Sequence, residues 1–150
     1  MHQQSTSHLF MIEPVEFYAN EQTAYTNHYQ KAVSDEAADK IAEKALSEFH
    51  DLKNAIEKRG IKVTTLLGSK DCPDHIFPNW FITFDDKTMQ IFSMMAPNRR
   101  EEKKSHMIQH LTETYELTDD MSDLEDKEIF LESTSSMVFD RVNRIVYGGI

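Results

Sequence analysis

The chain has 150 residues, the length of one ordinary domain, and a chain of this length buries about 68–70% of its unfolded surface when it folds. It carries 16 Lys and Arg against 26 Asp and Glu, and this net charge of −10, without a basic block, argues against nucleic acid or an anionic membrane as partner. The single cysteine, Cys72, excludes an internal disulfide framework and a multi-cysteine zinc site.

The first part of the chain predicts a strand, a helix and a second strand. Residues 8–12 (HLFMI) form a short apolar run typical of a buried strand, and residues 13–30 predict an ordered, partly exposed connection. From Asp35 to Arg59 the apolar residues recur every three or four positions, as on one face of a helix, and Gly60 supplies the stop. Residues 61–67 (IKVTTLL) are β-branched and apolar, which predicts a buried strand.

A hairpin and a second helix are predicted next. Two strands, about 77–84 and 89–94, are joined by a turn at the sequence DDK. The second helix is expected to begin after the sequence APN, with Asn98 as its cap and Glu101 closing a capping box. Its apolar stripe consists of Met107, Ile108, Leu111 and Tyr115.

The last part of the chain predicts short strands. The acidic stretch 118–128 (TDDMSDLEDKE) is interpreted as a solvated loop, and residues 129–131, 137–139 and 144–147 as strands. The alternation of strands and helices along the chain predicts an α/β fold made of ββαβ-like modules.

The cysteine, histidine and glycine patterns predict no nucleophile, metal site or phosphate-binding loop. Cys72 lies between acidic residues and a proline, without a basic neighbour to lower its thiol pKa, so we interpret it as a bystander in a loop. His106 and His110 have the spacing of a helical metal pair, but Met107 occupies the place of a zincin glutamate. The sequence has no glycine-rich phosphate loop. We therefore predict neither a metal nor an organic cofactor.

Three polar residues at strand ends remain as candidates: Asp74, Asn79 and Glu132. Taken singly, each could equally be a turn former or a helix cap instead of a ligand-binding residue. Trp80, beside Asn79, could equally be a core residue.

Four blocks carry a family resemblance: HLFMIEPVEFYANEQTAYTNHYQ, PDHIFPNWF, MMAPNRREEK and FLESTSSMVFDRVNRIVY. Together, and in this order, they resemble the N-terminal half of amidinotransferase-like hydrolases, in particular the citrulline-utilisation hydrolase branch of the arginine deiminase and dimethylarginine hydrolase superfamily. The resemblance implies the pentein fold, a five-bladed α/β propeller of ββαβ modules. Residues 1–150 would then form the N-terminal half of the propeller domain.

The resemblance also implies a chemistry. In that superfamily a cysteine thiolate attacks the central carbon of a guanidino or ureido group, and a histidine transfers protons. Glu132 matches the acidic residue of the family's LEG or LES block and is the expected catalytic residue, while Asp74 and Asn79 fall in the substrate-clamping segment. A guanidinium offers only donors and suits carboxylates, whereas a ureido group also offers an acceptor oxygen, which the Asn79 amide suits as well. Trp80 would be a packed wall beside this head group.

Two departures from the family pattern bear on activity. The family segment usually reads FPNNW, whereas this chain reads FPNW and offers one amide, Asn79. No cysteine follows Cys72 and no histidine follows His110, so the family's nucleophile and base are missing from these residues. Because attack requires both groups at near-attack distance, we expect little or no hydrolysis by this chain alone.

Three functions stay open at this stage. The chain is part of a citrulline or arginine hydrolase, a non-catalytic module that binds such a ligand, or an interaction protein or truncated fragment without a small ligand. An open propeller exposes apolar side chains and strand edges near residues 144–150, so we expect self-association or pairing with a complementary C-terminal half. The start of the sequence, MHQQSTSH, lacks the features of a signal peptide and no apolar segment is long enough to span a membrane, which predicts a cytoplasmic protein.

Overall fold

The computed structural model describes residues 4–25 and 35–149. It consists of two compact units, and each is described by itself. The N-terminal unit is Ser7–Pro78, and the C-terminal unit combines Met1–Thr6 with Asn79–Ile150.

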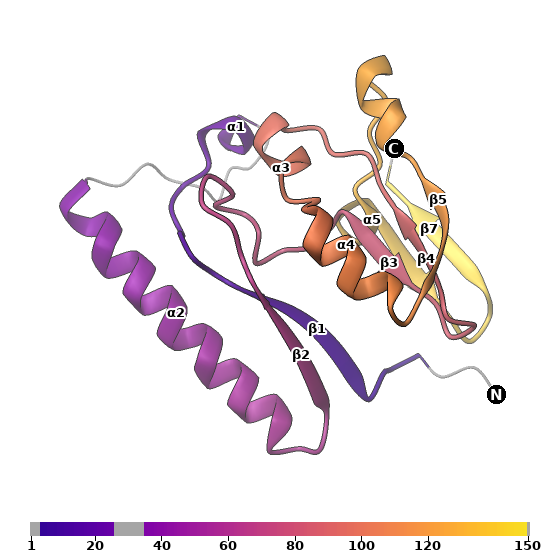
Figure 1. Ribbon diagram of the computed structural model, residues 1–150, viewed down its shortest axis with the longest axis horizontal. Helices are drawn as coiled ribbons and strands as arrows, with labels where there is room; N and C mark the ends of the chain where they lie inside the picture. Colours follow the sequence, from indigo (N-terminus) through magenta and orange to yellow (C-terminus); the bar gives the residue numbers. More distant parts are fainter. Residues whose placement is uncertain (1–3, 26–34, 150) are drawn as a thin grey trace. The chain divides into compact units, whose positions relative to one another are not determined.

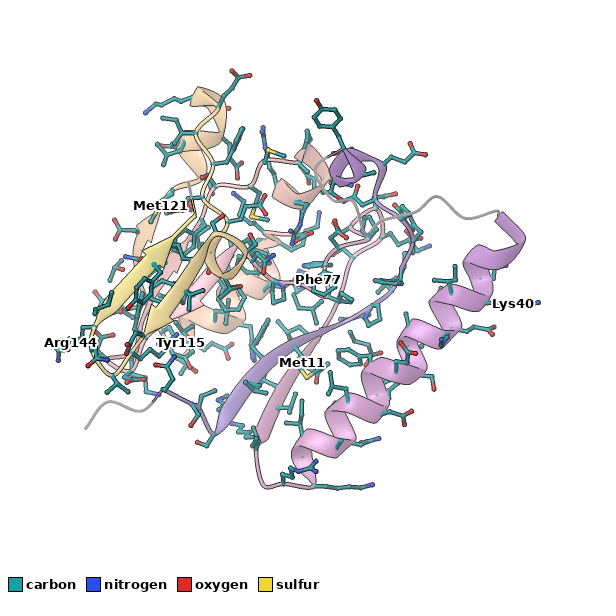
Figure 2. All side chains as sticks on the ribbon, turned by 180° about the vertical axis from the view of Figure 1, so that it is seen from behind. Met11, Lys40, Phe77, Tyr115, Met121 and Arg144 are labelled. Carbon is teal, nitrogen blue, oxygen red and sulfur yellow. The ribbon has the colours of Figure 1, made fainter. Side chains whose placement is uncertain are left out.

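The N-terminal unit is built on two parallel strands and one long helix. Strand β1 (His8–Glu13) pairs in parallel with β2 (Lys62–Leu67), in a register that runs from His8 opposite Lys62 to Glu13 opposite Leu67. Helix α2 (Asp35–Glu57) belongs to the crossover that parallel pairing requires, and Lys40 on it projects away from the strands (Figures 1 and 2). The predicted order of strand, helix and strand is confirmed.

The burial of β2 differs from the prediction. Its central residues are only half-buried and Leu67 is 61% exposed, so the expectation of a buried strand is wrong. The physical reason is that a sheet of two strands has too few neighbours to bury both faces, although β-branched side chains give the sequence the pattern of a core strand.

Two glycines fix the chain around these strands. Gly60 has φ +80°, the left-handed conformation expected just after a helix, in agreement with its predicted role as the stop of α2. Gly68 follows β2, where its amide donates to the carbonyl of Glu13 at 2.8 Å. A Cβ at this position would lie 2.8 Å from that same oxygen, so the backbone approach admits only glycine.

The C-terminal unit contains a three-stranded sheet in the order β3–β4–β5. Strand β3 (Phe81–Thr83) is antiparallel to β4 (Thr88–Ile91), and β4 is parallel to β5 (Glu116–Asp120). The predicted hairpin is present, with shorter strands than expected. Buried residues of this unit include Trp80, Ile82, Met89, Ile91, Phe92, Met94, Met107 and Leu111.

The acidic stretch is not the loop that its composition predicts. Its first residues belong to β5 and are followed by the 3₁₀ helix η1 (Ser122–Lys127). All five side chains of β5 are exposed, and the strand is held by its backbone pairing with β4 and by the amide of Gln90 donating to Asp119 at 3.0 Å. An edge strand of this kind has no apolar pattern, so hydrophobic periodicity cannot detect it.

The predicted second helix is divided in two, α3 (Pro97–Arg100) and α4 (Ser105–Thr112). The expected caps are wrong: the N-cap of α3 is Ala96 and that of α4 is Lys104, neither with a capping side-chain bond. Proline is favoured at the first helical position, so α3 begins at Pro97 and places Asn98 inside the helix rather than before it. The apolar stripe is confirmed in part, since Met107 and Leu111 are buried.

A short helix and a hairpin complete the unit. Helix α5 (Ser133–Ser136) precedes β6 (Met137–Asp140), which is antiparallel to β7 (Ile145–Gly148), close to the predicted positions. Residues 129–131 are not a strand, because Leu131 donates its amide to Ser93 alone, at both the hydroxyl and the carbonyl oxygen, and forms no ladder. None of the described helices is both long and apolar enough to cross a membrane.

Candidate functional site

Glu132 is the predicted site residue that lies at the start of helix α5 (Ser133–Ser136). It occupies the N-cap position of α5, and its side chain is 19% exposed. Its Oε1 accepts the amide N–H of Met95 at 3.0 Å, and its Oε2 lies 3.5 Å from Nη1 of Arg99 and 3.3 Å from Oγ of Ser135. Donors therefore contact both oxygens of the carboxylate, which restricts its orientation.

Behind Glu132 lies a buried ion pair that the sequence interpretation missed. Arg99 donates from Nε to Oε1 of Glu102 at 2.9 Å and from Nη2 to Oε2 at 3.2 Å, and the Glu102 side chain is completely buried. This two-point contact uses the planar fork of the guanidinium. The spacing of three residues between Arg99 and Glu102 could have indicated an ion pair. Nothing in the sequence, however, shows that the pair is buried.

Neighbouring charges clamp the segment that follows β4. Glu125 accepts the amide of Met94 at 2.8 Å and forms an ion pair with Lys103. Arg100 donates to the carbonyl of Met94 at 3.0 Å and to that of Met95 at 3.1 Å. Within the block MMAPNRREEK, Arg100 thus contacts the Met94–Met95 backbone directly and Lys103 supports it through Glu125.

Asn79 is joined to the same short helix. Its Oδ1 accepts a hydrogen bond from Oγ1 of Thr134 at 3.0 Å, and its Nδ2 has no hydrogen-bond partner among the residues that the structure describes. A second bond runs nearby, from Oγ of Ser133 to the carbonyl of Phe81 at 3.2 Å. Asn79 is thus linked through Thr134 to the same short helix whose N-cap is Glu132, 53 positions further along the sequence.

The backbone at the start of α5 is unusual. Ser133 is fully buried and has φ 25°, a conformation that L-residues rarely adopt. Such strain persists only where surrounding contacts determine it, and here the hydroxyl of Ser133 bonds to β3. The turn into α5 therefore holds Glu132 in one place.

Trp80 is a core residue of the C-terminal unit. It is completely buried, its ring centroid lies 4.6 Å from that of Phe81, and its carbonyl accepts the amide of Phe92 at 2.8 Å. Its Nε1 has no hydrogen-bond partner within the described part of the chain. Its packing agrees with the interpretation of Trp80 as a core residue, and its expected place beside a ligand head group stays a prediction.

Asp74 lies in the N-terminal unit, in a buried turn, and is 6% exposed. Its Oδ2 accepts from Nδ2 of Asn20 at 2.7 Å and from Oγ1 of Thr23 at 3.1 Å. Asn20 also caps α1 (Glu21–Ala24), because its Oδ1 accepts the amide of Gln22 at 3.1 Å. One asparagine thus orders a helix start and a carboxylate at once, a link that sequence reasoning did not identify.

Other candidates for chemistry lie outside these clusters. Cys72 is buried, with 2% exposure. His110 lies 3.7 Å from Glu113 on the exposed side of α4, and in residues 4–25 and 35–149 no group of three or more His, Cys, Asp or Glu side chains could hold a metal. His75 is buried, and its Nδ1 accepts the amide of Ser69 at 3.1 Å.

A cavity of about 440 Å³ occurs elsewhere in the C-terminal unit, next to the turns of its two hairpins. Arg144, in the turn between β6 and β7, marks its position in Figure 2. Neither Asn79 nor Glu132 lines it. Its lining residues are Phe84, Asp85, Asp86, Phe139, Asp140, Arg141, Arg144, Ile145 and Val146.

Hydrogen bonds within the hairpin turns explain why two carboxyl groups there have lowered pKa values. The hydroxyl and amide of Thr88 donate to Asp86 and lower the pKa of that carboxyl. The side chain and amide of Asn143 lower the pKa of Asp140 in the same way. In the N-terminal unit burial raises the pKa of Tyr18, with Glu16 contributing. These three shifts lie away from Glu132 and Asn79 in the sequence.

Comparison with known families gives one match over most of the chain. The model of the family described as N,N dimethylarginine dimethylhydrolase, eukaryotic, matches residues 13–150. A search of curated proteins gives no match.

Solved structures share the fold. The N-terminal domain of ArgZ bound to substrate, described as an arginine dihydrolase from the ornithine-ammonia cycle in Cyanobacteria, is 16% identical with a TM-score of 0.67, and the match covers 94% of this chain and 48% of that one. The ternary complex of AgrE with ornithine and NAD+ is 17% identical with a TM-score of 0.67, covering 97% of this chain and 20% of that one. The chain thus spans less than half of the length of either relative. The shared fold confirms the predicted α/β class.

Proposed function

The chain belongs to the N,N-dimethylarginine dimethylhydrolase family, within the amidinotransferase-like pentein superfamily, and we propose that it forms the N-terminal part of a cysteine-dependent hydrolase. The proposed substrate is the guanidino or ureido group of an arginine- or citrulline-like compound. The observation that carries this proposal is helix α5, whose N-cap is Glu132 and whose Thr134 bonds to Asn79. The superfamily was predicted from the sequence; its citrulline branch and the five-bladed propeller belong to the proposal.

Glu132 is the proposed catalytic residue of this chain. Its carboxylate is held on both oxygens, so it keeps its orientation when a ligand arrives. A planar guanidino or ureido group presents N–H donors at fixed angles and gains most from an acceptor that is already oriented. The contribution of Glu132 is therefore a fixed negative charge beside the head group.

Asn79 is the proposed reader of the head group. Thr134 occupies its Oδ1, so the amide presents Nδ2, a donor. A donor matches the oxygen of a ureido group, whereas a guanidinium offers no acceptor. This orientation favours citrulline-like over arginine-like compounds.

Asp74 is the second proposed substrate-binding residue, on the resemblance of its segment PDHIFPNWF to the family's clamp. It is supported by the buried donor Asn20 and the half-buried donor Thr23, which order its carboxylate within the N-terminal unit. Its role is tested by Asp74→Asn, which keeps the size of the side chain and removes the charge.

Binding without turnover is the activity proposed for these 150 residues alone. Cys72 is the only cysteine of the sequence and its thiol is buried, which does not suit a nucleophile that must meet a substrate. We propose that the nucleophile and base are supplied by a complementary C-terminal half. The exposed strand β7, with Val146 51% and Tyr147 58% exposed, supports pairing with such a partner or with a second copy.

Calorimetric titration of the purified chain with citrulline and with arginine tests the proposal, with ammonia release measured on the same sample. We expect citrulline to bind, Glu132→Gln and Asn79→Ala each to weaken binding about tenfold or more, and no ammonia to appear. Glu113→Gln, the same change at a carboxylate that is 68% exposed, serves as the control and should leave binding unchanged. Failure to bind either compound, or release of ammonia by the chain alone, would contradict the proposal.

A further inference from the structure

One side chain from the start of the sequence covers the outer edge of strand β6. The carboxamide of Gln4 donates from Nε2 to the carbonyl of Phe139 at 2.8 Å, and its Oε1 accepts the amide of Arg141 at 2.9 Å. A carboxamide carries the donor and the acceptor of a peptide group. Phe139 and Arg141 are alternate residues, which present their backbone groups on the same side of a strand. Gln4 therefore occupies a position that a neighbouring strand would take.

The surface around this contact suits an added strand. Among the described residues, β6 has β7 as its one strand neighbour. Two valines beside the edge are exposed, Val138 by 67% and Val142 by 53%. Strand addition draws affinity from backbone hydrogen bonds and specificity from hollows that receive alternate side chains. Such a hollow, of about 450 Å³, is lined here by Gln4, Val138, Phe139, Asp140, Val142 and Asn143.

The other strand of the same hairpin has the properties of the segment that would dock. All four residues of β7 are exposed, and the apolar side chains of Ile145, Val146 and Tyr147 are 44, 51 and 58% exposed. An exposed apolar edge strand is a template for pairing with another chain. We propose that the β6 edge is a docking surface for β7 of a second copy, and that Gln4 blocks it. The proposal rests on the hairpin and not on the proposed hydrolysis.

Pairing of this kind joins two different surfaces. When β7 of one copy meets β6 of the next, every added copy brings one further edge of each type, so the assembly need not close. With Gln4 in place the β6 edge is covered, and β7 can meet only β7 of another copy or a separate partner. Association then stops at a pair. Gln4 thus limits the size of the assembly.

Sedimentation velocity of Gln4→Ala tests the proposal, at about 0.15 M salt, where repulsion between chains of net charge −10 is screened. The unaltered chain should be no larger than a pair. Gln4→Ala should form larger species that grow with concentration and dissociate on dilution. Gln109→Ala, the same change at an exposed position of α4, is the control and should match the unaltered chain. A Gln4→Ala chain no larger than a pair would overturn the proposal.

A second change identifies the strand that docks. Val146→Lys places a charge on the β7 edge, and in the Gln4→Ala background it should return the chain to a pair or a single copy. Ile129→Lys adds the same charge at a side chain that is 53% exposed and lies outside the hairpin, and it should leave the larger species in place. Larger species that persist with Val146→Lys would exclude β7 as the docking strand and contradict the proposal.

Two backbone amides test the blocking role of Gln4 on single copies. The amide of Arg141 donates to Gln4, and that of Asn143 donates to Asp140, both at 2.9 Å. In dilute Gln4→Ala, hydrogen exchange measured by NMR should accelerate about fivefold at Arg141 relative to Asn143. Equal exchange at both amides would show that Gln4 does not cover the edge, and the proposal would fall. None of these measurements uses a ligand, so a failure of citrulline to bind would contradict the proposed function alone.

Discussion

Glu132 and Asp74 are carboxylates that each contact several donors within their own unit, and the donors differ in kind. Glu132, in the C-terminal unit, depends on Arg99 and on a backbone segment that other charged side chains clamp. Asp74, in the N-terminal unit, accepts from the amide of Asn20 and the hydroxyl of Thr23. The first arrangement uses charges whose burial is costly, and the second uses neutral donors that a helix cap already places.

This difference predicts different sensitivity to mutation. A buried ion pair adds little net stability while intact, but it destabilises strongly when one partner is removed. A neutral hydrogen bond loses about 1–3 kcal/mol when one partner is left buried without the other. The surroundings of Glu132 should therefore tolerate single changes less well than those of Asp74.

The largest expected effect is that of Arg99→Met. It leaves the buried Glu102 without its cation, and we expect the free energy of unfolding to fall by about 3–5 kcal/mol in urea denaturation. Lys104→Met breaks the pair with Glu101, which is 72% exposed, and should cost less than about 1 kcal/mol. Similar losses in both variants would remove the distinction between the two kinds of ion pair.

A smaller loss is expected around Asp74, whose donors are uncharged. Asn20→Ala removes the cap of α1 and the 2.7 Å donor to Asp74, so the free energy of unfolding should fall by about 1–3 kcal/mol. Asn54→Ala, the same change on the exposed side of α2, is the matched control and should be neutral or slightly stabilising. A loss at Asn20 as large as that of Arg99→Met would show that neutral and charged clusters do not differ as we argue.

A change at Asn79 should alter the preference between ligands and leave the stability of the fold unchanged. Asn79→Asp replaces the presented donor by an acceptor, which suits a guanidinium and not a ureido oxygen. We expect arginine to gain over citrulline by about tenfold, or about 1.4 kcal/mol, in the ratio of dissociation constants measured by calorimetry. An unchanged ratio with unchanged folding would exclude Asn79 as the reader of the head group.

The sequence predicted those parts of the structure that depend on local pattern. The order of β1, α2 and β2 and the hairpin of β6 and β7 follow from periodicity and from turn residues. Strand β5 could not be predicted in this way, because its side chains are polar and its pairing with β4 is non-local. The division of the second helix also depends on a detail, namely that Pro97 is preferred inside the first turn.

Of the candidate site, only the residues that lie within the sequence blocks could be predicted. The motifs indicated Asp74, Asn79 and Glu132, but not the side chains that hold them. Asn20 and Arg99 lie 54 and 33 residues from the carboxylates they contact, and no periodic pattern connects residues so far apart. Burial of Glu102 is likewise a property of the packed unit, since charged residues are ordinarily read as surface.

The smallest expected effect concerns two exposed turn acids, Asp86 and Asp140, which are held by neutral donors like Asp74 but in open solvent. Hydrogen bonds from Thr88 and Asn143 lower their folded pKa values below the ordinary value of 3.8, so the stabilisation is present above that pH and is lost as the pH falls through the lowered values. NMR titration should show the amides of Thr88 and Asn143 shifting together with these carboxyls below pH 3.8, and Asp86→Asn should abolish the shift at Thr88 alone. Titration of both carboxyls at or above 3.8 would show that donors in open solvent do not hold a carboxylate, and that the neutral arrangement around Asp74 depends on its burial.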